Sequence, residues 1–394
     1  MIKLRLILNI LFTCLLSAGT LSAQESQKKY SVDSYISNLQ SVIIDSVKGN
    51  WISDNLIHNR INFFWYPNEH FAFSAQLRNR FIYGESVKYN PGFASSANND
   101  NGFMDLSMNL LSEKSFFLNS TFDRLFLKYS NGSFVTTIGR QRINWGQNYV
   151  WNPNDIFNVQ NFFDFDYVEK PGSDALRIQY YTGETSAVEI AVKVDHYHNI
   201  TSAAYYRFNR WGYDFQVLGG LFESDDFIAG AGFAGHIKSA GCNGEISYFR
   251  PIENFRDTSS ILIFGLGTDY IFSNSIYLQV EGLFQHSEKK GSINDFYSWY
   301  TGNLNVKKLS FTDLSLYTNI SYPFTPLING SVSSTFFPEI KGYFAGPSMS
   351  YSASDNIELS VIAQYFSGIL PEPISGTEKR NSLFLGFLRI RVSI

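Results

Sequence analysis

Apolar and polar residues alternate with a period of two from about residue 70 to the C-terminus, and this alternation limits the fold more than any other feature. A β-strand points successive side chains to opposite faces, so each alternating stretch predicts a strand with one apolar and one polar face. The clearest stretches are 71–81, 188–195 and 384–394. In the first, one face carries Phe71, Phe73, Ala75, Leu77 and Phe81, and the other carries Ser74, Gln76, Arg78 and Arg80.

Alternation alone fits both a soluble sandwich and a membrane barrel, and strand length favours the barrel. Runs such as SSILIFGLGTDYIF exceed the about 5 to 6 residues of an ordinary strand and match the about 9 to 11 of a tilted membrane crossing. Tight turns alternate with polar loops over 287–306 and 367–380, and the last apolar strand ends at Ile394. We predict an all-β fold, an antiparallel transmembrane β-barrel of about 16 to 18 strands. A count of 18 strands requires residues 37–47 to pair with the barrel as well.

The N-terminus has the pattern of a secretory signal peptide over residues 1–23. Lys3 and Arg5 precede the apolar run LILNILFTCLL, and LSAQ supplies small residues for cleavage after Ala23. Only Cys242 then remains, so no intramolecular disulfide can form. After residue 23 no apolar run approaches the about 20 residues of a membrane helix. Residues 24–50 are predicted to be a periplasmic tail or plug segment, and residues 51–394 the outer-membrane barrel.

The polar stretch over residues 84–118 is predicted to be a single extracellular loop. A barrel strand at 103–111 would place residues 84–102 on the wrong side of the membrane, because strand directions alternate. Phe103, Leu106 and Leu110 recur at helical spacing, so we predict a short helix within this loop.

The segment GRQRINWGQNYVWNPND leaves the alternation near Trp145 and begins a long loop. Arg140 and Arg142 precede an acidic run that starts at Asp155 and is interleaved with aromatic residues. Exposed aromatic rings in a loop are unfavourable in water, so we predict that the long loop folds inward into the barrel. The alternative is an extracellular cap whose acids are solvated. The acidic run that starts at Asp155 continues through Asp164 and Asp166.

Further arginines fall on the predicted polar faces of the strands. A basic wall opposite acids of the inward loop would create a transverse field at a constriction. For Arg140 and Arg142 an alternative is that they anchor the loop by pairing with carboxylates such as Asp155. The predicted pore-lining or constriction residues are Arg78, Arg80, Arg140, Arg142, Trp145, Asp155, Asp164, Asp166, Arg177, Arg389 and Arg391.

Several other patterns lack the context that their chemistry needs. GAGFAG, from Gly230 to Gly235, lies inside an alternating strand rather than between a strand and a helix, so it does not predict dinucleotide binding. His196 and His198 have no third metal ligand placed by the sequence. No G-x-S-x-G occurs. We therefore predict no metal, no cofactor and no catalytic residue, and the balanced charge argues against a nucleic-acid partner.

The segment over residues 121–182 resembles a family of Gram-negative outer-membrane barrels, described as porin-like, that share GRQ-x-x-x-WG after a strand hairpin. The resemblance implies a membrane barrel with a transport role and brings no established substrate or catalytic residue. The matching residues are Asp123, Arg124, Gly139, Arg140, Gln141, Trp145, Gly146, Asn152, Pro153 and Asp155.

Together these patterns predict a porin-like channel for passive diffusion of small hydrophilic solutes across the outer membrane of a Gram-negative bacterium. Two alternatives stay open: a plugged barrel that acts in surface binding or envelope assembly, and an outer-membrane hydrolase. The predicted partners are outer-membrane lipid, small hydrophilic solutes and the barrel-assembly machinery, and a homo-oligomer stays open.

Overall fold

The protein is described here by a computed structural model over residues 29–44, 51–158, 169–253, 255, 260–287, 305–371 and 378–394. The predicted signal peptide over 1–23 lies outside the described residues, as do residues 24–28 and 45–50 of the predicted tail. No helix within these described ranges is long and apolar enough to cross a membrane.

The described residues form nineteen strands, two short α-helices and one 3-10 turn. Before the longest loop come β1 (Tyr30–Ile44), β2 (Trp51–Trp65), β3 (Phe71–Gly84), α2 (Glu85–Tyr89), α3 (Phe93–Ala97), β4 (Ser107–Ser112), β5 (Phe116–Asn131) and β6 (Phe134–Gln141). After it come β7 (Ser173–Tyr181), β8 (Ala187–Val194), β9 (Ile200–Arg210), β10 (Tyr213–Phe222), β11 (Asp226–Ile237), β12 (Ala240–Pro251), β13 (Ile261–Ile271) and β14 (Tyr277–Ser287). The last elements are β15 (Leu314–Thr325), β16 (Ile328–Phe337), η2 (Pro338–Ile340), β17 (Gly342–Ser354), β18 (Ile357–Pro371) and β19 (Glu378–Ser393).

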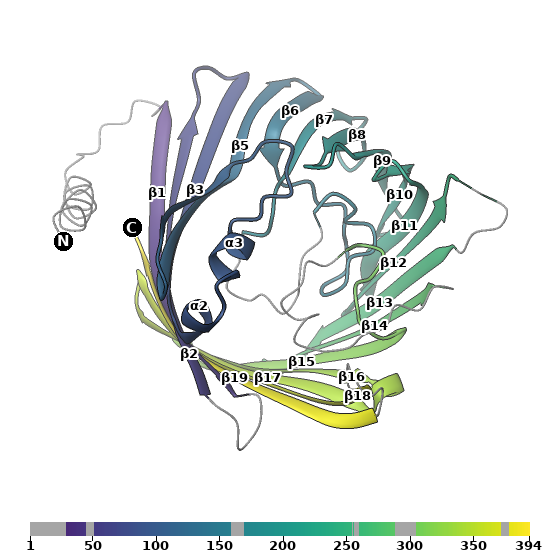
Figure 1. Ribbon diagram of the computed structural model, residues 1–394. Coiled ribbons are helices and arrows are strands. Elements are labelled where there is room, and N and C mark those ends of the chain that lie inside the picture. Colours follow the sequence, from purple (N-terminus) through teal and green to yellow (C-terminus); the bar gives the residue numbers. More distant parts are fainter. Residues whose placement is uncertain are drawn as a thin grey trace.

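The strands close into an antiparallel barrel (Figure 1). β1 pairs with β2 on one side and with β19 on the other, which closes the ring. β3 pairs directly with β5, so β4 is not part of the ring. The other eighteen strands form the ring. A closed ring satisfies the backbone hydrogen bonds of every strand internally. The predicted antiparallel β-barrel of 16 to 18 strands is confirmed.

The apolar faces of the strands point outward and the polar faces point into the barrel. In β8 the outward side chains of Val188, Ile190 and Val192 are exposed, whereas Ala187 and Ala191 are fully buried on the inner side. A soluble sandwich would bury these aliphatic side chains, because the burial of apolar surface drives the folding of a soluble protein. The outward apolar surface is typical of a barrel that faces lipid.

The two ends of the barrel differ in the length of their connections. All five two-residue turns, including Trp211–Gly212, lie at the end where β1 begins and β19 ends. Both residues of that turn have positive φ, at 55° and 79°, which suits the tight turn of a twisted hairpin. The long connections that follow β3, β6 and β14 begin at the other end. We call the two ends the short-turn end and the long-loop end.

The predicted tail or plug over residues 24–50 is wrong for residues 30–44. These residues form β1, which pairs with β2 from Tyr30 to Ile44 and with β19 from Tyr35 to Ile44. Without this strand β2 and β19 would each expose an unpaired edge, which is a costly arrangement in a membrane. The alternative prediction, in which residues 37–47 pair as a strand, is therefore closer to the structure, although the strand begins at Tyr30.

The predicted helix over residues 103–111 is also wrong. The two helices of this loop lie earlier, at α2 and α3, and residues 107–112 form β4. β4 pairs with β5 over 117–121, whereas β6 pairs with β5 only over 125–131. β4 thus supplies backbone partners to the part of β5 that the short β6 leaves unpaired.

Chain segments from the long-loop end lie inside the ring (Figure 1). Residues 142–158 pack on the inner faces of β7 to β15 together with Val306 and Leu309. α2 and α3 pack on β3 and β5 through Val87, Ala94 and Phe117. Inside the barrel the apolar core is therefore formed between loops and wall, and the prediction of a long inward-folded loop is confirmed over 142–158.

This architecture predicts opposite effects of one substitution at neighbouring positions of β16. Val332 is 52% exposed on the outer face, and Ser331 faces inward, where its hydroxyl contacts that of Ser348 at 2.7 Å. Val332→Arg should cost about 2–4 kcal/mol because it places a cation in lipid, whereas Ser331→Arg should be tolerated. Heat-modifiability on gels and urea titration of refolded protein measure both. Equal losses at the two positions would contradict the assigned faces.

Candidate functional site

Aromatic packing holds the inward loop, residues 142–158, against the wall. The Trp145 ring stacks on Tyr205 of β9 with ring centroids 4.9 Å apart and an interplanar angle of 16°. Phe157 meets Trp145 edge-on, also at 4.9 Å. The Trp145 indole N–H donates to Glu189 of β8 at 3.0 Å. The loop therefore enters the barrel because its large rings find an apolar inner surface there.

Two glutamates of the wall accept the backbone N–H groups of the loop. Glu245 of β12 accepts from residues 147–148 and, at 2.9 Å, from Asn154. Glu281 of β14 accepts from the three consecutive residues 149–151 at 3.1, 3.0 and 2.7 Å. Buried N–H groups without an acceptor are costly, so these two carboxylates allow an irregular segment to lie against the wall.

Glycines of the inner wall make room for the amide side chains of the loop. A Cβ atom at Gly230 would lie 2.4 Å from Oδ1 of Asn154, and one at Gly265 would lie 2.3 Å from Nδ2 of Asn148. Any larger residue would push the loop away from the wall. In GAGFAG, Gly230 and Gly232 therefore allow close packing between the loop and the strand, and Gly235 lies against the Tyr213 ring.

Arg140 ties the start of the loop to two carboxylates. Its Nε donates to Asp174 at 2.7 Å and its Nη1 donates to Asp100 at 2.6 Å. Its Nη2 donates to the carbonyl of Met104 at 2.6 Å. The guanidinium thus joins β6, β7 and the connection over 85–115, and charge-assisted bonds of this kind are strong.

Arg142 joins the start of the inward loop to its later residues. Its Nη2 donates to Asp155 at 2.5 Å and its Nη1 donates to the carbonyl of Asn158 at 2.7 Å. Asp155 is buried, and burial raises the pKa of its carboxyl to about 6, although the Arg142 guanidinium acts to lower it. This carboxyl therefore titrates near neutral pH.

These contacts change the assignment of several predicted pore-lining residues. Arg140, Trp145 and Asp155 are 4%, 2% and 4% exposed, so the expectation that they line the pore is wrong, because loop and wall cover them. Arg177 pairs with Glu189 at 2.5 Å beneath the loop. Asp164 and Asp166 lie outside the described residues.

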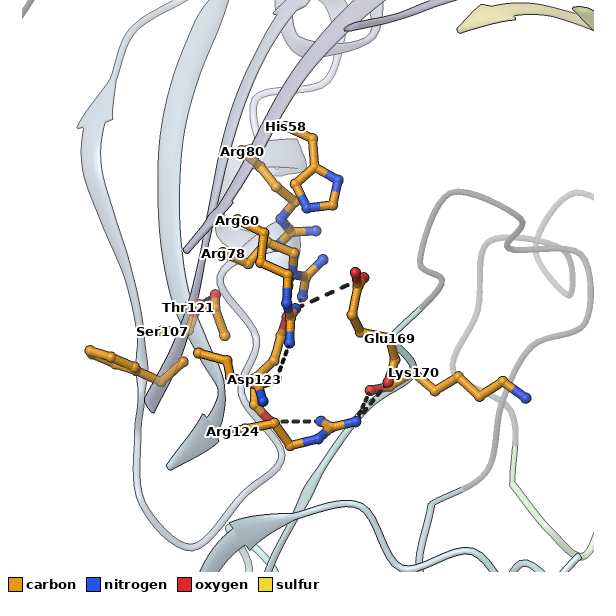
Figure 2. Close-up of polar contacts among 12 residues, drawn as sticks. His58, Arg60, Arg78, Arg80, Ser107, Thr121, Asp123, Arg124, Glu169 and Lys170 are labelled. Carbon is orange, nitrogen blue, oxygen red and sulfur yellow. Dashed lines mark hydrogen bonds and ion pairs between the residues drawn. The ribbon is translucent and has the colours of Figure 1, made fainter. Parts of the chain in front are cut away.

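A strip of arginines covers the inner faces of β2, β3 and β5 (Figure 2). Asp123 lies at its centre and accepts from Arg60 at 2.5 Å and from Arg78 at 3.0 Å. A register shift in the pairing of β3 with β5 marks a bulge, and both Asp123 and Arg124 are buried on the inner side. A bulge re-aims side chains, so it adds a guanidinium that strict alternation would point outward. We call Arg60, Arg78, Arg80 and Arg124 the arginine strip.

Residues 169–170, shortly before β7, contact the arginine strip (Figure 2). Arg124 Nη2 donates to the carbonyls of Glu169 and Lys170 at 2.6 and 2.9 Å. The Glu169 carboxylate accepts from the Tyr35 hydroxyl at 2.7 Å and lies 3.9 Å from Arg60. The loop therefore contacts both walls of the barrel.

The two predicted arginines of β19 lie beside this strip. Arg389 pairs with Glu358 of β18 at 3.0 Å, and the Arg391 guanidinium lies 4.0 Å from the ring centre of Tyr35. Arg80 donates to the Ala97 carbonyl and to Asn119, both at 2.8 Å. Arg78, Arg80, Arg389 and Arg391 face the inside of the barrel, as their polar-face positions predict. They lie on one side of it because β19, β1, β2 and β3 are neighbours in the ring.

Sequence reasoning missed Arg60, His58 and Tyr35. The first two occupy even positions of β2 on the same face as Asn62, so the alternation of this strand could have identified them. Tyr35 lies in the segment predicted to be a tail or plug.

His196 and His198 flank the exposed Tyr197, and the described residues contain no group of three or more potential metal ligands.

Comparisons with known proteins identify the fold. No known protein family matches the sequence, and no curated protein is similar to it. The BenF-like porin of Pseudomonas fluorescens Pf-5 superposes with a TM-score of 0.59 at 8% identity, covering 93% of this chain and 99% of that one. OccAB4 of Acinetobacter baumannii gives 0.57 at 9%, with 93% and 99% covered. OprD of Pseudomonas aeruginosa gives 0.55 at 8%, with 95% and 97% covered. The chain therefore shares its barrel fold with these proteins.

Proposed function

We propose that the protein is a porin-like channel for passive diffusion of small hydrophilic solutes across the outer membrane of a Gram-negative bacterium. One observation carries the proposal: the barrel of eighteen strands holds its inward loop on the walls of β7 to β15 and carries charged side chains on the opposite wall. A barrel of about 16 or more strands encloses more space than its own wall side chains fill. The likeness in fold to a BenF-like porin supports the same function.

The charges of the wall favour anions as solutes. Arg80, Arg389 and Arg391 are partly exposed on this wall, and their guanidinium groups stay protonated at any physiological pH. The other arginines of the strip are buried. A net positive wall in a narrow aqueous path raises the local concentration of anions. We therefore expect anionic solutes to pass more readily than cations of equal size.

The same proposal fixes the orientation and the export route. The short-turn end lies in the periplasm and the long-loop end outside the cell, which is the usual arrangement of bacterial barrels. Residues 1–23 act as a cleaved signal peptide, and the barrel-assembly machinery inserts the mature chain. The protein acts without a catalytic residue and without a cofactor.

Planar-bilayer recording of the refolded mature chain tests the channel. We expect steady single-channel steps with a reversal potential on the anion side in a KCl gradient. Arg391→Gln combined with Arg80→Gln should move this potential toward cations, because two fixed positive charges leave the wall. Lys238→Gln, in the turn between β11 and β12, is the control and should leave it unchanged. Cation preference in the native protein would contradict the charge argument.

A second function has one observation in its favour. The packed core between loop and wall includes nineteen buried residues, so the inward loop fills part of the lumen. Membranes that stay silent in the recording, while the protein is folded on gels, would favour a plugged barrel for surface binding or envelope assembly. Release of fatty acid or peptide by the same preparation would favour a hydrolase.

A further inference from the structure

The outward face of β1, β2 and β3 departs from the apolar pattern of the barrel. Along β3 the outward residues are aromatic or aliphatic at Phe71, Phe73 and Leu77, and then the outward position 79 carries an asparagine. In the strand register Asn79 lies directly opposite Asn59 of β2. Polar amides thus occupy adjacent strands on a surface that otherwise faces lipid.

Six polar side chains form this outward feature, which we call the amide ladder. Asn79 Nδ2 donates to Asn59 Oδ1 at 3.2 Å, and Ser120 Oγ of β5 donates to Asn79 Oδ1 at 2.6 Å. The same face of β1 and β2 holds a second group, in which Asn55 Nδ2 donates to Gln40 Oε1 at 3.0 Å and Asn38 Nδ2 to Asn55 Oδ1 at 2.9 Å. The members of the ladder are Asn38, Gln40, Asn55, Asn59, Asn79 and Ser120, of which Asn55 is covered by its neighbours.

Asn59 lies near the middle of the membrane, which rests on the membrane location proposed above. β2 begins at Trp51 and ends at Trp65, and both indoles are exposed on the outer face. Aromatic side chains of barrels gather at the two membrane interfaces. Asn59 is about midway between these tryptophans, so it and its neighbour Asn79 face the hydrocarbon.

Hydrocarbon offers these amides no hydrogen-bond partner. Each amide has two N–H donors, and within the described residues Asn59 places one of them on the Tyr35 carbonyl at 3.1 Å while Asn79 places one on Asn59. Polar groups facing lipid are unfavourable, but between two membrane segments they hold the segments together. The ladder therefore fits a protein contact better than a lipid contact.

We propose that a second copy of this chain covers the amide ladder, forming a two-fold dimer in the membrane. Two copies inserted in the same orientation can be related only by an axis along the membrane normal, so each residue near the axis meets its counterpart at the same depth. An amide is both donor and acceptor, so Asn59 and Asn79 are complementary to themselves. No other partner is guaranteed to carry a polar group at this depth.

The same outer face offers space for side chains of the second copy. A hollow of about 580 Å³, lined by Tyr30, Phe63, Trp65 and Phe73, lies at the short-turn end of β1, β2 and β3. The outward faces of β8 and β13 instead present contiguous aliphatic and aromatic side chains such as Ile190, Phe264 and Leu266. The dimer contact is therefore expected on β1 to β3 and not on those strands.

Cysteine cross-linking in isolated outer membranes tests the contact. The full chain with Cys242→Ser provides a background without a native thiol in its mature part. In that background Asn79→Cys should give a disulfide-linked dimer on oxidation, and Ile190→Cys, a lipid-facing control on β8, should not. A monomeric band at Asn79→Cys, or equal cross-linking at both positions, would overturn the proposal. So would a cross-link formed only to a different polypeptide.

The mass of the protein in detergent gives a second readout. Sedimentation should show a dimer for the native chain, and Asn59→Leu combined with Asn79→Leu should raise its dissociation constant about tenfold while the barrel stays folded on unheated gels. A native monomer, or a dimer that the leucine variant leaves unchanged, would overturn the proposal. Conductance of the leucine variant should equal that of the native chain, so a failed channel and a failed dimer give different results.

Discussion

Leucine in place of both Glu245 and Glu281 should release the inward loop and raise single-channel conductance several-fold. The two carboxylates accept six backbone N–H groups of residues 147–154. Each buried N–H that loses its acceptor costs about 1–3 kcal/mol, so the attached state loses more than about 6 kcal/mol. Hydration then stabilises the loop segment more than its contacts with the wall do, so the segment leaves the lumen. Bilayer recording and limited proteolysis within 142–158 measure the release.

Two controls separate loop release from general damage. Glutamine at both positions keeps one acceptor oxygen at each site, so its effect should be smaller. Glu358→Leu removes a wall carboxylate that pairs with Arg389 instead of the loop, and its conductance should stay near the native value. Native conductance together with protease resistance in the double leucine variant would show that aromatic packing alone holds the loop.

Arg140→Ala should destabilise the barrel rather than change its ion preference. The substitution leaves Asp100 and Asp174 buried without their cation, and removal of one partner from a buried ion pair costs about 3–5 kcal/mol. We expect the folded band on unheated gels to disappear at a lower temperature. Arg142→Ala should have a smaller effect, because that side chain is partly exposed and forms an ion pair with one carboxylate, Asp155, rather than two.

Arginine-to-lysine exchange at the same position is the matched control. Arg140→Lys keeps the charge but not the forked geometry that reaches both carboxylates and the Met104 carbonyl, so we expect partial recovery of heat stability. If Arg140→Ala keeps the native heat stability and instead shifts the reversal potential toward cations, Arg140 acts as a pore charge and our assignment fails.

Alternation predicted the strands well because it is a local signal. Val188, Ile190 and Val192 had to face one side of β8, and only the choice between core and lipid needed more evidence. β1 was predicted only in part, as the alternative in which residues 37–47 pair, and the amide ladder explains why. Its outward positions include Asn38 and Gln40, which interrupt an otherwise apolar face.

The contacts that fix the loop could not be read from the sequence. The aromatic content of residues 142–158 predicts burial, but Glu245 and Glu281 lie far along the chain and look like ordinary lumen residues of their strands. β4 also depends on tertiary context, because it pairs with β5 only where β6 has ended. The arginine strip was partly predictable, since Arg78 and Arg80 lie on a regular polar face whereas Arg124 faces inward through a bulge.

The pairing of β1 with β19 makes completion of the barrel depend on the whole chain. Tyr35 meets Ser393, so the seam joins the first and the last strand that the structure describes. β1 is synthesised before β19, and its second edge has no partner until β19 is present. Contacts between such distant residues form slowly, and an open edge invites misassembly with other chains. A chain that stops short of β19 would therefore keep two reactive edges, and the cell would have to hold or degrade it.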